Sequence, residues 1–266
     1  MQIKKSEIIN KIKQKKEFLG LADSVVSGIV EKNLSKVKIR EVEDKLEYSK
    51  EFQIKELVKL ARSQLRRYTG MFQVSSKNRV HLLKSSNINL LFKTHQSTKE
   101  RIDFYPVLKK KIKDLKISSI LDLGCGLNPV AIAEKGVFYF ASDIRNDELD
   151  LIKDYFKSNK ISGKTFIFDL NDASKFSTLP KADLCLLLKV FDLLDDKRAI
   201  AQKVFSELPC NYFIISFSTR KLSGRIMNQP RRLWFEDILL KFNLNYETFH
   251  SDNEIFYFIK SKLTDE

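Results

Sequence analysis

Apolar residues recur at helical spacing in the first third of the chain, between many lysines and arginines. Ile54, Leu57 and Ala61, for example, follow one another at steps of three and four residues. Such steps place side chains on one face of a helix. The pattern predicts helices over residues 4–18, 23–30, 35–48, 51–68 and 76–84, with Gly70 as a stop after the fourth.

The rest of the chain alternates short apolar runs with amphipathic stretches. The runs predict strands within 120–123, 137–141, 165–168, 183–190 and 212–217, and a closing hairpin of strands over 243–250 and 254–260. Helices are predicted over 107–115, 146–158, 197–208 and 232–241. Strands that alternate with helices are typical of a parallel sheet covered on both faces. The predicted fold class is therefore α/β, a doubly wound sheet over residues 87–266 that follows a helical domain over residues 1–86.

Helix starts are also marked before the first strand and after it. Ser97 and Glu100 have the spacing of a capping box, and Pro106 should kink or restart the helix that follows. Asn128 is predicted to cap a helix whose first residue is Pro129.

The turn after the first predicted strand is a candidate ligand site. Gly124 and Gly126 lack a Cβ atom, so the backbone there can turn sharply and approach a ligand closely. Asp143 ends the next strand, 21 positions after Asp122, where a carboxylate can accept both hydroxyls of a ribose. The third glycine of a dinucleotide fingerprint is absent. An adenosine ligand without phosphate, such as S-adenosylmethionine, therefore fits better, and an ordinary tight turn is the alternative.

Polar side chains also converge at the helix start near residue 97. His95, Thr98 and Arg101 lie within two turns of one another, and an arginine there can hold a carboxylate with two parallel hydrogen bonds. A helix start without further function is the alternative reading.

The distribution of charge along the chain predicts a class of binding partner. The formal net charge is +14, and residues 1–84 hold 20 Lys and Arg against 10 Asp and Glu. A basic domain beside a nearly neutral one predicts a polyanion such as RNA or DNA. Arg62 and Arg66 share one helix face, which is either a phosphate-contacting patch or a solvated surface.

A second basic segment follows the strand over 212–217. Arg220, Arg225 and Arg231 lie there, together with Gly224. Because ligands bind at the carboxyl ends of parallel strands, the segment predicts a flexible basic lid beside the ligand site, which suits an RNA substrate. A solvated loop is the alternative.

Other classes of protein are disfavoured by the composition. No apolar run approaches the ~18 residues of a membrane span, and the amino-terminal residues do not have the pattern of a signal peptide. Cys125, Cys185 and Cys210 lack metal-ligand spacing. We therefore expect reduced thiols in a cytoplasmic protein that binds no metal and no membrane.

Several motifs together resemble one known family. His95-x-Ser97-Thr98-x-Glu100-Arg101, followed by the segment 120–129, is similar to the aminoglycoside-resistance 16S rRNA guanine-N7 methyltransferases. Segments 183–189, 216–225 and 234–236 extend the resemblance, which covers about residues 87–260. Ser218 stands where the pattern of the family has proline.

The resemblance implies a methyltransferase fold that uses S-adenosylmethionine and a helical domain that docks on the small ribosomal subunit. It implies that Arg101 binds the methionine carboxylate, that Gly124 underlies the methionine moiety and that Asp143 takes the ribose hydroxyls. The full expected cofactor set is His95, Ser97, Thr98, Arg101, Asp122, Gly124, Gly126, Asn128, Asp143 and, at the adenine, Asp169 and Leu170. The residues expected to contact 16S rRNA are Lys189, Arg220, Arg225, Arg231, Arg62 and Arg66.

The chemistry implied by the family needs no general base. Guanine N7 carries a lone pair and no proton, so alignment and exclusion of water suffice. Pro209-Cys210 precedes the fifth strand and is interpreted as a helix stop with a buried thiol. We expect a monomer that methylates guanine N7 in the decoding region. Two alternatives stay open: a methyltransferase of another RNA, and a non-catalytic RNA-binding relative.

Overall fold

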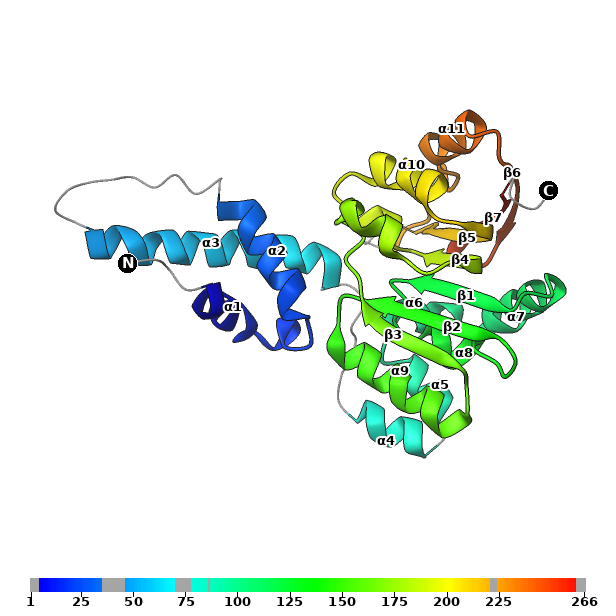
Figure 1. The fold of residues 1–266 in the computed structure, drawn as a ribbon, viewed down its shortest axis with the longest axis horizontal. Helices are drawn as coiled ribbons and strands as arrows, with labels where there is room; N and C mark the ends of the chain where they lie inside the picture. Colours follow the sequence, from blue (N-terminus) through cyan, green and yellow to red (C-terminus); the bar gives the residue numbers. More distant parts are fainter. Residues whose placement is uncertain (1–4, 35–45, 70–77, 86, 221–223, 262–266) are drawn as a thin grey trace.

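The structure is a computed structural model that describes residues 5–34, 46–69, 78–85, 87–220 and 224–261. Within these ranges a group of helices precedes a seven-stranded sheet that has helices on both faces (Figure 1). In the described part of the chain, no helix is both long enough and apolar enough to cross a membrane.

The first helices form a unit with a core of its own. They are α1 (Lys5–Lys13), the short 3-10 helix η1 (Lys16–Phe18), α2 (Asp23–Leu34) and α3 (Leu46–Thr69), hereafter the helical unit. Ile12, Phe18 and Leu65 are among the apolar side chains buried between them. The expected helix over 4–18 is therefore interrupted after Lys13. Most of the expected helix over 35–48 lies outside the described residues, as does Gly70, although α3 does end at Thr69.

Short helices connect this unit to the sheet. They are α4 (Arg79–Lys84), α5 (Ile88–Phe92), α6 (Gln96–Arg101), η2 (Ile102–Phe104) and α7 (Tyr105–Asp114). The predicted restart at Pro106 is confirmed, because this residue lies in the first turn of α7, where its missing N–H removes no hydrogen bond. Helix α5 was not expected, since five residues are too few to display a period. The proposed domain boundary at residue 86 falls among these connections and stays a prediction.

The sheet has the strand order β3-β2-β1-β4-β5-β7-β6. Its strands are β1 (Ser119–Leu123), β2 (Phe138–Asp143), β3 (Gly163–Ile167), β4 (Ala182–Leu188), β5 (Cys210–Ser218), β6 (Asn245–His250) and β7 (Glu254–Lys260). Strands β1 to β5 are parallel, and β7 is antiparallel to both β5 and β6. The predicted strands and the closing hairpin are confirmed. The order reverses between β1 and β4, and ligands bind at such a switch point, at the carboxyl ends of the strands.

Alternation along the strands sends side chains to two separate cores. In β4, Leu184, Leu186 and Leu188 pack on one face, while Cys185 and Leu187 pack on the other. The first face is covered by α7, α8 (Asn128–Ile132) and α9 (Asn146–Asn159). The second face is covered by α10 (Lys197–Glu207) and α11 (Leu233–Lys241), together with the 3-10 helices η3 (Ala173–Thr178) and η4 (Phe191–Leu193). Burial on both faces explains the continuous apolar runs in the sequence.

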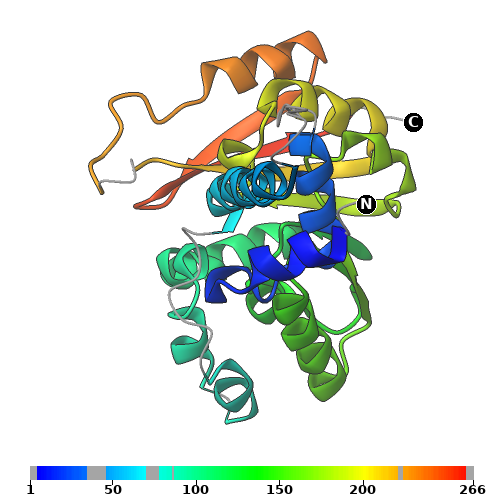
Figure 2. The ribbon, with the colours of Figure 1, turned by 90° about the vertical axis from the view of Figure 1, so that its left-hand side faces the viewer.

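The helical unit is attached to the carboxyl edge of the sheet, and Figure 2 views the molecule from the side of this unit. Leu21 forms an isolated antiparallel bridge with Arg145 in the loop after β2. The Ala22 N–H donates to Ile144 O at 3.0 Å, and the Asn146 N–H donates to Gly20 O at 2.8 Å. The unit thus holds the loop that follows Asp143.

A second attachment lies on the β4 side of the same edge. The Tyr68 hydroxyl donates to Asp195 Oδ2 at 2.7 Å, and Gln64 Nε2 donates to the same oxygen at 3.1 Å. Burial raises the pKa of Tyr68, and its hydrogen bond to Asp195 adds to the shift, so the hydroxyl keeps the proton that it donates. The two attachments span the edge between β2 and β4.

Replacement of Gly20 by alanine should loosen the first attachment. A Cβ atom at Gly20 would lie 2.2 Å from the Asp147 carboxylate and 2.3 Å from the Arg145 guanidinium, which are ion-paired at 2.6 Å. Because these side-chain ends can move apart, we expect Gly20→Ala to break the ion pair and lower the free energy of unfolding by about 1 kcal/mol, measured by urea denaturation. Gly28→Ala is the control, because a Cβ at Gly28 in α2 meets nothing within 4 Å. Equal stability of the two variants would contradict the prediction.

Candidate functional site

A cavity opens at the carboxyl ends of β1 to β4. It holds about 800 Å³ of empty space, part of it open to solvent. The expected site residues that line it are His95, Ser97, Gly124, Gly126, Asp143, Asp169, Leu170 and Lys189. Residues that were not expected also line it, among them Tyr68, Thr69, Arg145, Glu148 and Asn171. The sheet therefore brings together residues from four strand ends, and the end of α3 completes one wall.

The glycine turn after β1 is shaped by contacts that exclude side chains. Gly124 and Gly126 have φ angles of +73° and +48°, which are unfavourable for residues with a Cβ atom. A Cβ atom would lie 2.6 Å from Val190 Cγ1 at Gly124, and 3.0 Å from the His95 ring at Gly126. Glycine is required at both positions, and the turn lies close against the loop after β4.

Asp143 holds this turn from the end of β2. Its Oδ2 accepts the Gly126 N–H at 3.0 Å, and its Oδ1 accepts the Arg145 N–H at 3.1 Å. Burial raises the pKa of Asp143 to about 6, and these two backbone donors only partly oppose the shift. The carboxylate is thus placed in the cavity wall by the loop that the helical unit holds.

Asp122 lies behind the cavity and is not among the residues that line it. It is fully buried, and the Tyr139 hydroxyl donates to its Oδ2 at 2.8 Å. Burial raises the pKa of Asp122 to about 7. Its expected role toward a cofactor stays a prediction.

The predicted capping box at the start of α6 is wrong. His95 is the N-cap residue and makes no side-chain capping bond, and Ser97 already lies inside the helix. The Ser97 hydroxyl lies 3.1 Å from His95 Nδ1, and the Glu100 carboxylate accepts from the side chains of Gln96 and Lys189. Thr98 donates its hydroxyl to two backbone carbonyls, so its side chain is used to fix the turn. Burial lowers the pKa of His95 to about 4, which keeps the ring neutral.

The predicted cap at Asn128 is also wrong, by one residue. Leu127 is the N-cap of α8, and Asn128 is its first helical residue. The Asn128 Oδ1 accepts hydrogen bonds from Arg101 at 2.7 Å and from the Tyr105 hydroxyl at 2.8 Å. The Asn128 side chain therefore binds Arg101 and Tyr105 instead of capping the helix as the local pattern predicts.

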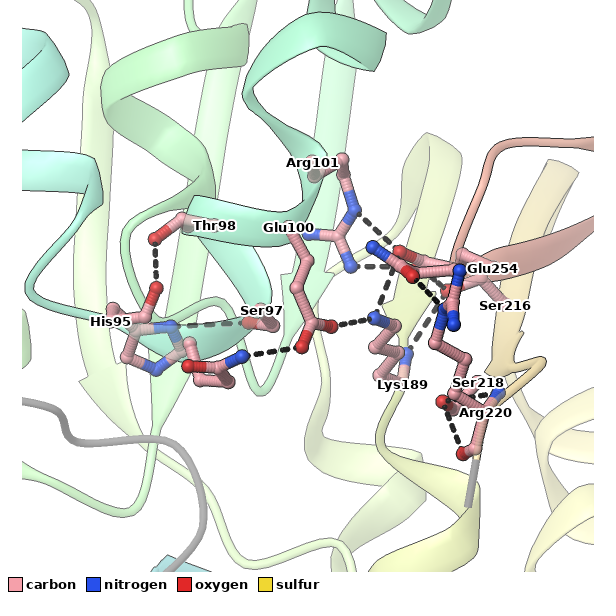
Figure 3. A network of polar contacts seen from close by, with 12 residues as sticks. His95, Ser97, Thr98, Glu100, Arg101, Lys189, Ser216, Ser218, Arg220 and Glu254 are labelled. Atoms are coloured by element: carbon pink, nitrogen blue, oxygen red, sulfur yellow. Dashed lines mark hydrogen bonds and ion pairs between the residues drawn. The ribbon is translucent and has the colours of Figure 1, made fainter. Parts of the chain in front are cut away.

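Arg101 is fully buried and its guanidinium is directed at a carboxylate of the protein (Figure 3). Nε and Nη2 donate to the two oxygens of Glu254 at 3.1 and 2.7 Å. Burial alone would lower the pKa of Arg101, but the Glu254 charge raises it above its usual value. Arg101 is not among the residues that line the cavity. Its expected contact with a methionine carboxylate stays a prediction.

Glu254 connects Arg101 to the cavity through Lys189. Lys189 Nζ lies 2.6 Å from Glu100 Oε2 and 3.5 Å from Glu254 Oε2. The Ser216 hydroxyl donates to Glu254 and accepts the Lys189 N–H at 3.0 Å. Glu100, Arg101, Lys189 and Glu254, hereafter the charged cluster, contain two cations and two carboxylates. Nothing in the sequence pointed to Glu254, because it lies 153 residues from Arg101.

The basic positions on α3 bind the helical unit together. Arg62 donates to the carbonyls of Lys11 and Ile12 at the end of α1, and Arg66 pairs with Glu17 at 2.9 Å. Arg66 is nevertheless half exposed, so part of its surface faces solvent. Contact of either arginine with RNA stays a prediction.

The basic segment after β5 has partners of its own. Arg220 donates to Asn253 at 2.5 Å, and Arg231 forms a double contact with Glu236 at 2.7 Å. Arg225 is exposed. The structure therefore brings Lys189 to the cavity, whereas these three arginines do not line it.

The family follows from comparison with known proteins. The model of the ribosomal RNA methyltransferase (FmrO) family matches residues 49–239, well over half of the chain. The chain belongs to this family. It is 29% identical over 189 residues to the 16S rRNA (guanine(1405)-N(7))-methyltransferase of Serratia marcescens, covering 68% of this chain and 74% of that protein. The corresponding enzyme of Frankia casuarinae is 26% identical over 65% of this chain and 63% of its own length. The resemblance found in the sequence is confirmed.

Solved structures agree with this assignment. The 16S rRNA methyltransferase RmtF in complex with S-adenosyl-L-homocysteine is similar in fold, with a TM-score of 0.78 and 21% identity over 98% of this chain and all of that one. The 16S rRNA methylase ArmA is 29% identical over 70% of this chain and all of its own, with a TM-score of 0.54. The predicted methyltransferase fold class is confirmed.

Removal of one partner of the buried Arg101–Glu254 pair should destabilise the fold strongly. Loss of one partner would leave a buried charge without its counterion. We expect Glu254→Gln to lower the free energy of unfolding by about 3–5 kcal/mol, measured by chemical denaturation. Glu31→Gln is the control, because Glu31 pairs with Lys5 at the surface, and it should change stability negligibly. A Glu254 variant as stable as the parent would show that the pair is not needed for the fold.

Proposed function

We propose that this protein transfers a methyl group from S-adenosylmethionine to N7 of a guanine in the 16S rRNA of the small ribosomal subunit. The observation that carries the proposal is the cavity at the switch point between β1 and β4. In a chain of the ribosomal RNA methyltransferase family, this cavity joins the glycine turn, Asp143 and Lys189. The methyl group on N7 would make the subunit resistant to aminoglycosides that need an unmodified N7.

The residues of the cavity fit an adenosine that carries a methionine. Asp143 offers a carboxylate for the ribose hydroxyls, and Gly124 leaves space where a Cβ atom would collide with Val190. Asp169 and Leu170, at the end of β3, supply a polar and an apolar contact for the adenine. The sulfonium of this cofactor supplies a methyl group that is already activated for transfer.

Arg101 takes part in this site from behind the cavity wall. For its guanidinium to bind the cofactor carboxylate, Glu254 has to release part of the double contact that it makes now. In the arrangement seen here, Arg101 instead fixes Asn128, which begins α8 directly after the glycine turn. We propose that Arg101 binds the cofactor carboxylate directly once Glu254 has released part of its contact.

The cavity contains what a reaction at guanine N7 requires. N7 carries a lone pair and no proton, so no side chain has to remove one. The enzyme must align the base and exclude water, which rigid walls accomplish. Cavity residues such as Gly124, Asp143 and Lys189 are held by backbone geometry, hydrogen bonds or ion pairs. A guanine that is stacked in an RNA helix has to be turned out of its stack to enter.

The substrate partner is proposed to be the assembled subunit, bound by a monomer of this enzyme in the cytoplasm. The helical unit lies at the same edge of the sheet as the cavity, and Arg66 and Arg67 on α3 are at least half exposed. Exposed cations next to the reaction site favour a polyanionic substrate. Arg225 is exposed in the segment after β5 and is proposed to contact the RNA as well.

Methyl transfer to intact subunits tests this function. We expect label from methyl-labelled S-adenosylmethionine to enter 16S rRNA of small subunits, and mass analysis of nucleosides to identify 7-methylguanosine. Transfer RNA and subunits without enzyme are the controls. Label in tRNA alone, or a product other than 7-methylguanosine, would contradict the proposal and favour the other RNA methyltransferase reading. Failure to bind the cofactor by calorimetry would favour a non-catalytic relative.

Cofactor binding should weaken at acidic pH because of Asp143. Its pKa is about 6, so below pH 6 the carboxyl is protonated and has to lose the proton before it accepts both ribose hydroxyls. The dissociation constant should be constant above pH 7 and rise about tenfold for each pH unit below 6. Calorimetry between pH 5 and 8 measures it. Asp143→Asn should bind weakly with no such slope, and a slope that persists in this variant would assign the titration to another group.

A further inference from the structure

We propose that Lys189 selects guanine over adenine by donating a hydrogen bond to O6 of the target base, and that Glu100 and Glu254 hold its ammonium group for this contact. The inference rests on the proposed function and names the residue that reads the base in the same site. It makes Lys189 a specificity-determining residue in addition to a contact with RNA.

The position of Lys189 in the sheet supports this role. It follows the last residue of β4, and β4 lies beside β1, whose end is followed by Gly124. Lys189 and Gly124 line the same cavity, and a Cβ atom on Gly124 would come within 2.6 Å of the neighbouring Val190. The lysine therefore lies across the switch point from the glycine turn. Ligand and substrate meet at this place in open α/β sheets.

The backbone of Lys189 is held in an unfavourable conformation. Its φ angle is +59°, in the left-handed region that residues with a Cβ atom rarely adopt. The N–H of Lys189 donates to the carbonyl of Ser216 at 3.1 Å and to its hydroxyl at 3.0 Å, which fixes this conformation. Such strain persists where the surroundings enforce it, and it is frequent at functional sites.

The ammonium group of Lys189 is fixed as well. Its side chain is only 6% exposed, and Nζ lies 2.6 Å from Glu100 and 3.5 Å from Glu254 (Figure 3). An ammonium has three N–H donors and no acceptor. In the described part of the chain, Nζ contacts these two carboxylates, which leaves the third N–H donor. Because Lys189 lines the cavity, we infer that this donor serves a base that enters it.

Guanine and adenine differ at the position next to the reacting atom. On the same edge of the purine, guanine presents N7 and the acceptor O6, whereas adenine presents N7 and an amino group that donates. When N7 of a base lies at the reaction site, the group on the neighbouring carbon therefore lies in the cavity as well. The ammonium can donate to O6, but it meets another donor when the base is adenine. A fixed cation at this position therefore favours the binding of guanine over that of adenine.

The charged cluster allows this contact without opposing the reaction. As the N7 lone pair forms the new bond to the methyl carbon, the bond from the methyl carbon to sulfur breaks and its electrons stay on sulfur. No proton leaves, and a positive charge develops on the purine. A lone lysine at O6 would repel this charge. Glu100 and Glu254 balance Lys189 and Arg101, so the cluster offers a donor with no net charge.

The experiment removes the lysine and the O6 atom separately and together. The variant is Lys189→Met, and the control is Lys181→Met, an exposed lysine just before the other end of β4. The substrates are small subunits reconstituted with guanine, with hypoxanthine, which keeps O6, or with 2-aminopurine, which lacks it, at the target position. Rates of 7-methylation are measured together with cofactor affinity by calorimetry.

We expect the parent and Lys181→Met to methylate guanine and hypoxanthine at similar rates and 2-aminopurine at least tenfold more slowly. Lys189→Met should lose at least tenfold on guanine and lose nothing more when O6 is removed. Its cofactor affinity should stay within about threefold of the parent. These results together would assign the O6 contact to Lys189.

Two results overturn the inference. One is a Lys189→Met enzyme that methylates guanine like the parent, and the other is one that still loses tenfold when O6 is removed. If Lys189→Met does not bind the cofactor, Lys189→Arg keeps a cation between the two carboxylates and should keep the dependence on O6. Loss of that dependence in a cofactor-binding arginine variant also overturns it. A parent enzyme that forms no 7-methylguanosine contradicts the proposed function instead, independently of any variant.

Discussion

The buried ion pair between Arg101 and Glu254 is the interaction on which the site depends. Removing two charges from water is costly, and only complete pairing compensates for it. Both oxygens of Glu254 are used, and the third side of the guanidinium binds Asn128. The pair joins α6, which precedes the sheet in the chain, to β7, the last strand in the chain. Through Ser216 and Lys189 it also reaches β5 and β4, so four segments are fixed around one point.

The arrangement of strands explains why this point becomes a site. Because β1 and β4 are neighbours in the sheet, the glycine turn after one lies beside Lys189 after the other. Gly124 leaves room for Val190, and Asp143 accepts the N–H of Gly126. A wall of this kind has little freedom to relax. That rigidity suits a substitution in which alignment, rather than proton transfer, has to be provided.

The helical unit is part of this arrangement and does more than carry charge. It pairs with the loop after Asp143 through Leu21 and Arg145, and it contacts the β4 side through Tyr68 and Asp195. Tyr68 also lines the cavity. The surface proposed to dock on RNA and the wall of the proposed cofactor site therefore belong to the same helices. A shift of the helical unit would therefore move residues of the cavity wall.

The sequence by itself determined the alternation of strands and helices, the doubly wound sheet and the glycine turn with its acid. Each of these depends on the period of apolar residues or on the special freedom of glycine, both of which are local properties. The caps assigned to Ser97 and Asn128 were wrong because other side chains compete with the nearby backbone for polar groups: His95 contacts Ser97, and the distant Arg101 binds Asn128. Glu254, which lies 153 residues from Arg101, was found only in the tertiary structure. Contacts of that kind depend on how the strands are ordered in space, and no local pattern encodes that order.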